Sequence, residues 1–89
     1  MASAVDLASR LLDRAVAHGQ AVVRCDASTP SDDVREHVRA LARAQGLRVR
    51  TGMLDDVLVV ARADADLWND DTPTMRAKLT APAVVGEIA

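Results

Sequence analysis

Arginines at alternate positions of three short apolar segments are the residues of this chain best suited to bind a ligand. They are Arg24, Arg48, Arg50 and Arg62, within residues 21–26, 47–51 and 57–62. Successive side chains of a β-strand point to opposite faces, so one face of a sheet is predicted to carry all four guanidinium groups. The other face then collects small apolar side chains and forms a core. A row of guanidinium groups can bind phosphates.

A second row of arginines follows a predicted helix. Arg35, Arg39 and Arg43 recur every four residues, a spacing that places them along one side of that helix. Together the two rows predict a surface that follows a nucleic-acid backbone, through Arg24, Arg48, Arg50, Arg62, Arg35, Arg39 and Arg43. The net charge of −2 argues against tight non-specific binding to a polyanion, so only a local basic surface is expected.

A rival interpretation is that protein covers the arginine face. The face is also predicted to hold Val22, Leu58 and Val60, and it lacks the aromatic side chains on which bases stack. Trp68 is the only aromatic residue, and tryptophan is enriched at the energetic centres of protein interfaces. The cover is either the acidic stretch around Trp68, a protein partner, or a second copy packed back to back. The predicted protein interface comprises Trp68, Val22, Leu58 and Val60.

Residue types that serve catalysis and metal binding are few. Cys25 falls on the inward face of a predicted strand, and the two histidines, His18 and His37, are predicted to belong to helices. A buried thiol is a poor nucleophile, and the four glycines are isolated, so no phosphate loop is indicated. The acidic run 64–71 lacks the glycine and the final glutamate of a calcium loop. We therefore expect no enzymatic activity, no catalytic residues, no cofactor and no metal.

Three helices and three strands are predicted to position these side chains. Ser3 and Asp6 resemble a capping box, and Pro30 after Thr29 suits the first turn of a helix. The predicted elements are helix 4–18, strand 21–26, a helix from Pro30 to Gly46, strands 47–51 and 57–62, and a short helix at 72–80. The fold class is predicted to be α+β: a two-layer sandwich in α-β-α-β-β-α order, with a mixed three-stranded sheet, two helices on one face and a short C-terminal helix.

Length and composition limit the size and the setting of the protein. The 89 residues predict one domain over 1–80, with an acidic connector at 63–71 and a flexible tail at 81–89. Phe and Tyr are absent, so the core must be built from Ala, Val and Leu. A single cysteine excludes an intrachain disulfide, and no apolar run reaches the roughly 20 residues of a membrane span. We expect a cytoplasmic protein that does not bind membranes.

One stretch of the chain is similar to a known nucleic-acid-binding family. Residues 34–62 resemble the Arg-x-x-x-His domain in a helix that ends in Gly46-Leu47, a basic strand, a turn and a Val-rich strand. Arg35 falls at the position of the family's arginine, whereas Arg39 stands at the histidine position and His37 lies two places earlier. The resemblance implies a single-stranded nucleic acid as ligand.

Charge, motifs and resemblance together predict a small non-enzymatic binding or regulatory protein. Ten arginines against one lysine indicate a GC-rich genome, and we expect a bacterium or one of its mobile elements as the source. DNA or RNA is the leading ligand, bound through the arginine face. The alternative is a protein-interaction module or homodimer that uses Trp68 and the outer sheet face.

Overall fold

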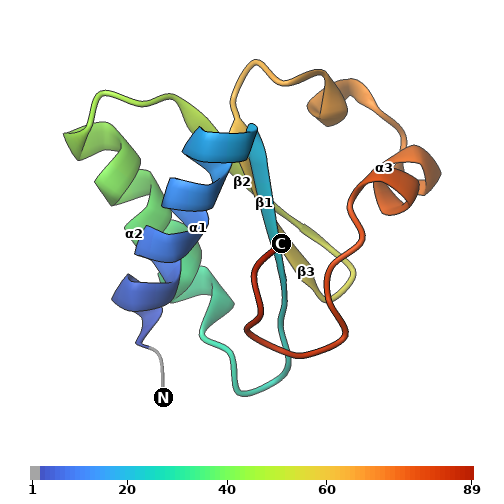
Figure 1. The fold of residues 1–89 in the computed structure, drawn as a ribbon, viewed down its shortest axis with the longest axis horizontal. Coiled ribbons are helices and arrows are strands. Elements are labelled where there is room, and N and C mark those ends of the chain that lie inside the picture. Colours follow the sequence, from blue (N-terminus) through green and yellow to red (C-terminus); the bar gives the residue numbers. More distant parts are fainter. Residues whose placement is uncertain (1–2) are drawn as a thin grey trace.

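Helices and strands follow one another in the predicted α-β-α-β-β-α order (Figure 1). The structure is a computed structural model that describes residues 3–89, so the first two residues of the predicted domain 1–80 lie outside it. The elements are α1 (Ala4–His18), β1 (Gln20–Arg24), α2 (Ser31–Ala44), β2 (Val49–Leu54), β3 (Val57–Arg62), the short 3-10 helix η1 (Asp66–Asn69) and α3 (Thr72–Lys78). The α+β class is confirmed.

Side chains just before the helices set two of the three helix starts. The Ser3 hydroxyl accepts a hydrogen bond from the Asp6 backbone N–H at 3.1 Å and so caps α1, as predicted. Asp71 caps α3 through a backbone N–H of its first turn at 2.9 Å. Thr29 does not cap α2, because its hydroxyl is bound to the Asp26 carboxylate in the preceding turn.

The two long helices, α1 and α2, pack together over one face of the sheet (Figure 1). Between the helices and the sheet lies a core of small and medium side chains: Leu7, Ala8, Leu11, Ala15, Ala21, Val23, Cys25, Val34, Val38, Leu58 and Val60. Each fully buried Val or Leu contributes roughly 1.5–3 kcal/mol through removal of its apolar surface from water. In a chain without Phe or Tyr, this helix-side core gains its stability from many small and medium side chains.

The sheet is antiparallel throughout, in the order β1-β3-β2. The predicted mixed sheet is therefore wrong. β1 and β2 do run in the same direction, as expected for strands joined through a helix, but β3 lies between them and pairs with both. A two-residue turn, Asp55-Asp56, joins β2 to β3, and Asp55 takes a φ of 58°, a left-handed conformation that Asp tolerates better than most residues.

The length of this turn decides which side chains of β3 face the helices. Leu54 pairs with Val57 and Thr51 with Val60, and directly paired residues share a face. The residues predicted for the arginine face, Leu58, Val60 and Arg62, therefore lie on the helix side. The residues of β3 on the outer face, opposite the helices, are Val57, Val59 and Ala61. The prediction was wrong because one residue more or less in a turn exchanges the two faces of a strand.

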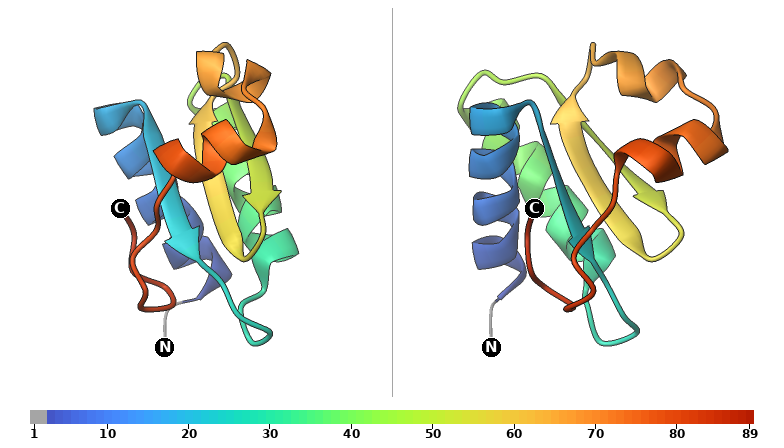
Figure 2. Two further views of the ribbon diagram at one scale, coloured as in Figure 1. Left: turned by 90° about the vertical axis from the view of Figure 1, so that its right-hand side faces the viewer. Right: turned by 45° about the vertical axis from the view of Figure 1, so that its right-hand side comes forward.

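The outer face of the sheet is covered by the C-terminal third of the chain (Figure 2). A second core forms there from Val22, Val57, Val59, Ala61, Leu67, Leu79 and Ala81, with Leu54, Ala65, Trp68, Met75 and Ala89 packed around it. The interpretation in which Leu67 and Trp68 cover the sheet is thus confirmed. Of the residues predicted to lie beneath them, Val22 does so, whereas Val57 and Val59 take the place of Leu58 and Val60. The outer face leaves no room for a back-to-back dimer.

Trp68 is the largest side chain of this cover. Its Nε1 donates a hydrogen bond to the Arg62 carbonyl at 2.8 Å, and the Arg50 guanidinium lies 4.8 Å from its ring centre. Glycine at position 52 suits this packing, because a Cβ there would lie 3.1 Å from a ring carbon and the ring would have to shift by a few tenths of an ångström. The Trp68 side chain therefore has a structural role within the protein.

Residues 81–89, predicted to form a flexible tail, run beside β1. Val22 and Ala89 exchange two backbone hydrogen bonds, of 2.9 and 3.0 Å, and Gly86 donates a third to Arg24 at 3.1 Å. The Arg24 side chain donates to the Pro82 carbonyl and to the Asp56 carboxylate, at 3.1 and 2.8 Å. This segment occupies the edge of β1, so within residues 3–89 the edge of β2 is the one left without a neighbouring strand.

Replacement of Trp68 with Ala is expected to destabilise the fold by roughly 2–3 kcal/mol, because it opens a void over Gly52 and removes a hydrogen bond. Trp68→Phe keeps most of the packing and is expected to cost only about 1 kcal/mol. Urea unfolding followed by circular dichroism measures both. Unchanged stability of Trp68→Ala would contradict a structural role for the cover.

A bidentate ion pair ties α3 to the β2–β3 turn. The Arg76 Nε and Nη2 atoms lie 2.8 and 3.0 Å from the two Asp55 carboxylate oxygens. Hydrogen bonds from Arg76 hold the pKa of Asp55 below its ordinary value. Asp26 and Asp71 also have lowered pKa values, because they accept hydrogen bonds from Ser28 and Thr74 respectively.

These lowered pKa values predict a loss of stability in acid. A carboxyl with a lower pKa in the folded state stabilises the fold above its unfolded pKa, and this stabilisation disappears as the pH falls through the folded pKa. The urea midpoint is expected to begin falling near the unfolded aspartate pKa of about 3.9 and to continue falling below it. In the Asp55→Asn variant the urea midpoint should fall less steeply with decreasing pH. The Asp13→Asn variant, changed at an exposed aspartate, should show the same fall as the unmodified protein. Identical acid profiles of the two variants would contradict the role given to Asp55.

Candidate nucleic-acid interface

Five of the seven arginines predicted to bind phosphates lie around the free edge of β2. Arg50 belongs to β2 and Arg48 directly precedes it, while the other three belong to α2. We call this set the arginine surface: Arg35, Arg39, Arg43, Arg48 and Arg50. It combines the helical row with the part of the strand row nearest to it.

A groove joins the two rows. It has a volume of about 390 Å³, and Arg39, Arg43 and Arg48 line it over a floor of Ala42, Leu47, Val49 and Ala63. Gly46 permits this arrangement. It follows the end of α2 with a left-handed φ of 69°, which turns the chain toward β2 within a few residues. Helix and strand thus present their guanidinium groups to the same hollow.

Contacts outside the groove fix the other two members of the arginine surface, Arg35 and Arg50. The Arg35 Nε donates a hydrogen bond to the Thr51 hydroxyl at 3.1 Å, which joins α2 to β2 and leaves the other N–H groups of the guanidinium for a ligand. The Arg50 guanidinium lies over the Trp68 ring in a cation–π contact, 4.8 Å from the ring centre. Both contacts hold the side chains in place without neutralising them.

The charge of the arginine surface is not balanced by ion pairs within residues 3–89. The ion pairs found there join Arg24 to Asp56, Arg62 to Asp64, Arg76 to Asp55 and Lys78 to Asp70. All four involve other basic residues. An anion that reaches the arginine surface therefore meets five cationic groups without first displacing a carboxylate from them.

Arg24 and Arg62 do not belong to this surface. Arg24 pairs with Val57 and so lies on the outer sheet face, as predicted, whereas the predicted four-arginine face is wrong for Arg62. Arg24 points to the C-terminal segment and the β2–β3 turn, where its bonds to Asp56 and Pro82 are structural. Arg62 lies on the helix side of the sheet and forms an ion pair with Asp64 at 2.9 Å. Arg62 lies on the helix side because the two faces of β3 are exchanged relative to the prediction.

The predicted protein interface is also wrong in its valines and leucine. Leu58 and Val60 are fully buried beneath the helices, and Val22 is only 4% exposed beneath the C-terminal segment. Trp68 is half-buried and already in contact with Arg50 and Gly52. These four side chains form part of the two cores.

The thiol and the imidazoles show no arrangement suited to catalysis. Cys25 is buried, and its burial raises the pKa of the thiol, an effect to which the charges of Asp56 and Asp26 add. His18 and His37 are exposed on different helices. Within the part of the chain described, no three His, Cys, Asp or Glu side chains are placed to hold a metal ion. No helix within residues 3–89 combines the length and the apolar character needed to cross a membrane.

Comparison with known proteins adds no family to this description. No protein-family model, curated protein or solved structure matches the chain. The resemblance to the Arg-x-x-x-His domain stays a prediction. The ligand must be inferred from the geometry of the arginine surface.

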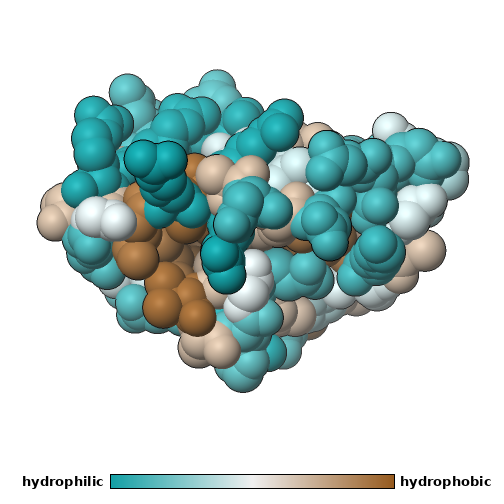
Figure 3. Space-filling view, turned by 90° about the horizontal axis from the view of Figure 1, so that it is seen from above, coloured by the Kyte–Doolittle hydropathy of each residue, from teal (hydrophilic) through white to brown (hydrophobic). Residues whose placement is uncertain are grey.

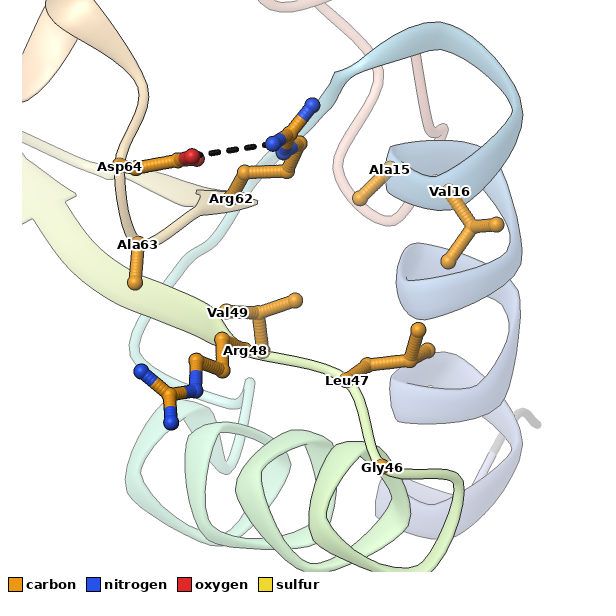
Figure 4. A pocket seen from close by; sticks show the side chains of 9 residues that line it. All are labelled: Ala15, Val16, Gly46, Leu47, Arg48, Val49, Arg62, Ala63 and Asp64. Carbon is orange, nitrogen blue, oxygen red and sulfur yellow. Dashed lines mark hydrogen bonds and ion pairs between the residues drawn. The ribbon is translucent and has the colours of Figure 1, made fainter.

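A second hollow was not predicted from the sequence. It lies at the end of the molecule where α1 ends and β2 begins, and apolar atoms ringed by hydrophilic side chains are visible there in Figure 3. Its volume is about 520 Å³, and it is lined by Ala15, Val16, Gly46, Leu47, Arg48, Val49, Arg62, Ala63 and Asp64 (Figure 4). Val16, which is 59% exposed, is one of two exposed valines of α1 and the one that borders this hollow.

The Cys25 thiol is expected to react slowly with alkylating reagents in the native protein at neutral pH. Burial blocks access, and a raised pKa keeps the thiolate fraction small. Mass spectrometry after iodoacetamide treatment, with and without urea, measures the difference. Reaction of the native thiol as fast as that of the unfolded chain would contradict the inward placement of Cys25.

Proposed function

We propose that the protein is a non-enzymatic, cytoplasmic nucleic-acid-binding protein that holds phosphates on the arginine surface. One observation carries the proposal: five arginines lie on α2 and at the free edge of β2, three of them line one groove, and none of the five forms an ion pair within residues 3–89. The regulatory role and the bacterial or mobile-element source expected from the sequence belong to the same proposal.

The spacing of the cationic groups suits a chain of phosphates. Arg35, Arg39 and Arg43 follow one another at about 6 Å along the helix axis, since each residue rises about 1.5 Å. Arg48 lines the groove opposite Arg39 and Arg43, and Arg50 follows it two residues later in β2. Guanidinium groups bind phosphate oxygens through two parallel N–H donors, which favours Arg over Lys for this contact.

Phosphates rather than bases are the expected contacts. Trp68 is the only aromatic side chain, and its ring is in contact with Arg50 and Gly52, so it offers no stacking platform. The outer sheet face is covered by the chain itself. Binding is therefore proposed to depend strongly on salt and weakly on base sequence.

The free edge of β2 favours a second candidate, an extended acidic segment of a protein partner. Backbone groups on an unpaired strand edge can add a further strand, and the arginines would meet its carboxylates. A second copy of this chain is a poorer occupant, because two arginine surfaces would repel each other. The experiment below separates nucleic acid from an acidic segment.

Binding is tested with a short labelled oligonucleotide of mixed sequence, as single strand and duplex, by fluorescence anisotropy. Affinity for the single strand is expected to fall roughly a hundredfold between about 50 and 200 mM salt, as five phosphate contacts require. The double variant Arg48→Glu plus Arg50→Glu should abolish binding at the higher salt concentration.

A matched control comes from α1, where Arg10 and Arg14 are exposed and form no ion pair within residues 3–89. Arg10→Glu plus Arg14→Glu changes the net charge by the same amount and should retain most of the affinity. Equal losses in the two double variants would show that net charge, not the arginine surface, determines binding. Absence of binding at low salt, with capture of a labelled poly-glutamate peptide instead, would replace nucleic acid by the acidic segment.

A further inference from the structure

The 520 Å³ pocket beside Val16 has the size and the walls of a small-molecule site. Three elements enclose it: the last turn of α1, the chain entering β2, and the end of β3. In Figure 4 the side chains of Val16, Leu47 and Val49 point into the space between α1 and the sheet. The pocket is too small for a helix of a partner protein and suits a compact ligand.

The pocket exists because small residues meet at the end of the helix-side core. Ala15 and Ala63 form two of its walls, and neither reaches across. The chain has no Phe or Tyr that could fill such a space. Its walls are consequently aliphatic, and the exposed Val16 side chain would lose contact with water if an apolar chain entered.

One cationic group stands at the rim. Arg62 forms a single hydrogen bond to Asp64, at 2.9 Å, and the two side chains are 69% and 72% exposed. Ion pairs this exposed are weak and exchange readily with other anions. The guanidinium has further N–H donors, so a ligand carboxylate could join or replace Asp64. Arg48 also lines the pocket, although its side chain points away from the cavity (Figure 4).

We infer that this pocket binds a small carboxylic acid with an unbranched aliphatic chain. The chain lies against Val16, Leu47 and Val49, and the carboxylate accepts hydrogen bonds from Arg62. The charged lining residues are Arg48, Arg62 and Asp64, so the pocket carries a net positive charge that favours an acid over an amine. The aliphatic walls offer an aromatic ligand no ring to stack on. This site adjoins the arginine surface, because Leu47, Arg48, Val49 and Ala63 line both hollows. The residue proposed to bind the carboxylate is Arg62, which lies outside that surface, so the inference does not rest on the proposed function.

The test is an NMR titration of the full-length protein with butanoate, hexanoate, octanoate and the neutral alcohol hexanol. Affinity is expected to rise roughly two- to fourfold for each added methylene group, as burial of the chain requires. Hexanoate should bind roughly two- to fivefold more tightly than hexanol, the range for an exposed charge contact. Backbone shift changes should centre on Val16, Leu47 and Ala63.

Variants separate the pocket from unspecific binding. Val16→Asp places a carboxylate at the pocket and should abolish hexanoate binding, whereas Val5→Asp, at a similarly exposed valine of the same helix, should leave it unchanged. Arg62→Met should remove the preference for hexanoate over hexanol and keep the dependence on chain length. The inference is overturned if hexanoate and octanoate cause no shifts, or if the Val16 and Val5 variants bind equally. Circular dichroism of each variant confirms that it is folded.

Discussion

Burial of β3 on both faces is the constraint on which the rest of the structure depends. All five residues from Val57 to Ala61 are at most 6% exposed, so the central strand needs apolar cover on each side. α1 and α2 supply one cover, and the segment from Ala65 to Ala89 supplies the other. With β3 in the centre, β1 and β2 become edges. The C-terminal segment occupies the edge of β1, so the arginines of β2 border the remaining open one.

The fold divides the arginines into two groups by what lies near them. Arg24, Arg62 and Arg76 each have an aspartate within 3 Å, and Arg24 also binds a carbonyl of the C-terminal segment. These three arginines form ion pairs that hold turns and segments together. The arginine surface is built from residues of the same type whose partners are a hydroxyl and an aromatic ring. A locally positive surface can therefore exist on a chain with a net charge of −2.

Sequence patterns with an unambiguous period or cap were sufficient to predict the helices, the order of elements and the helical arginine row. Ser3 before the first helix and the four-residue spacing of Arg35, Arg39 and Arg43 along the second are local signals of this kind. The facing of β3 could not be predicted in the same way. Five consecutive apolar residues carry no alternation, and only the two-residue length of the Asp55-Asp56 turn sets the register. The pocket beside Val16 depends on packing between distant elements, which no local pattern encodes.

The continuous apolar run of β3 also has a consequence for chains that are not fully folded. A short uncharged stretch with high β propensity and no proline is the type of segment that pairs with its own kind and starts aggregation. In this chain Asp55 and Asp56 stand immediately before the run and Arg62 ends it. Such flanking charges oppose the stacking of identical segments, because like charges would then lie beside one another. The residues that close the turn and shape the pocket rim thus also protect the nascent chain.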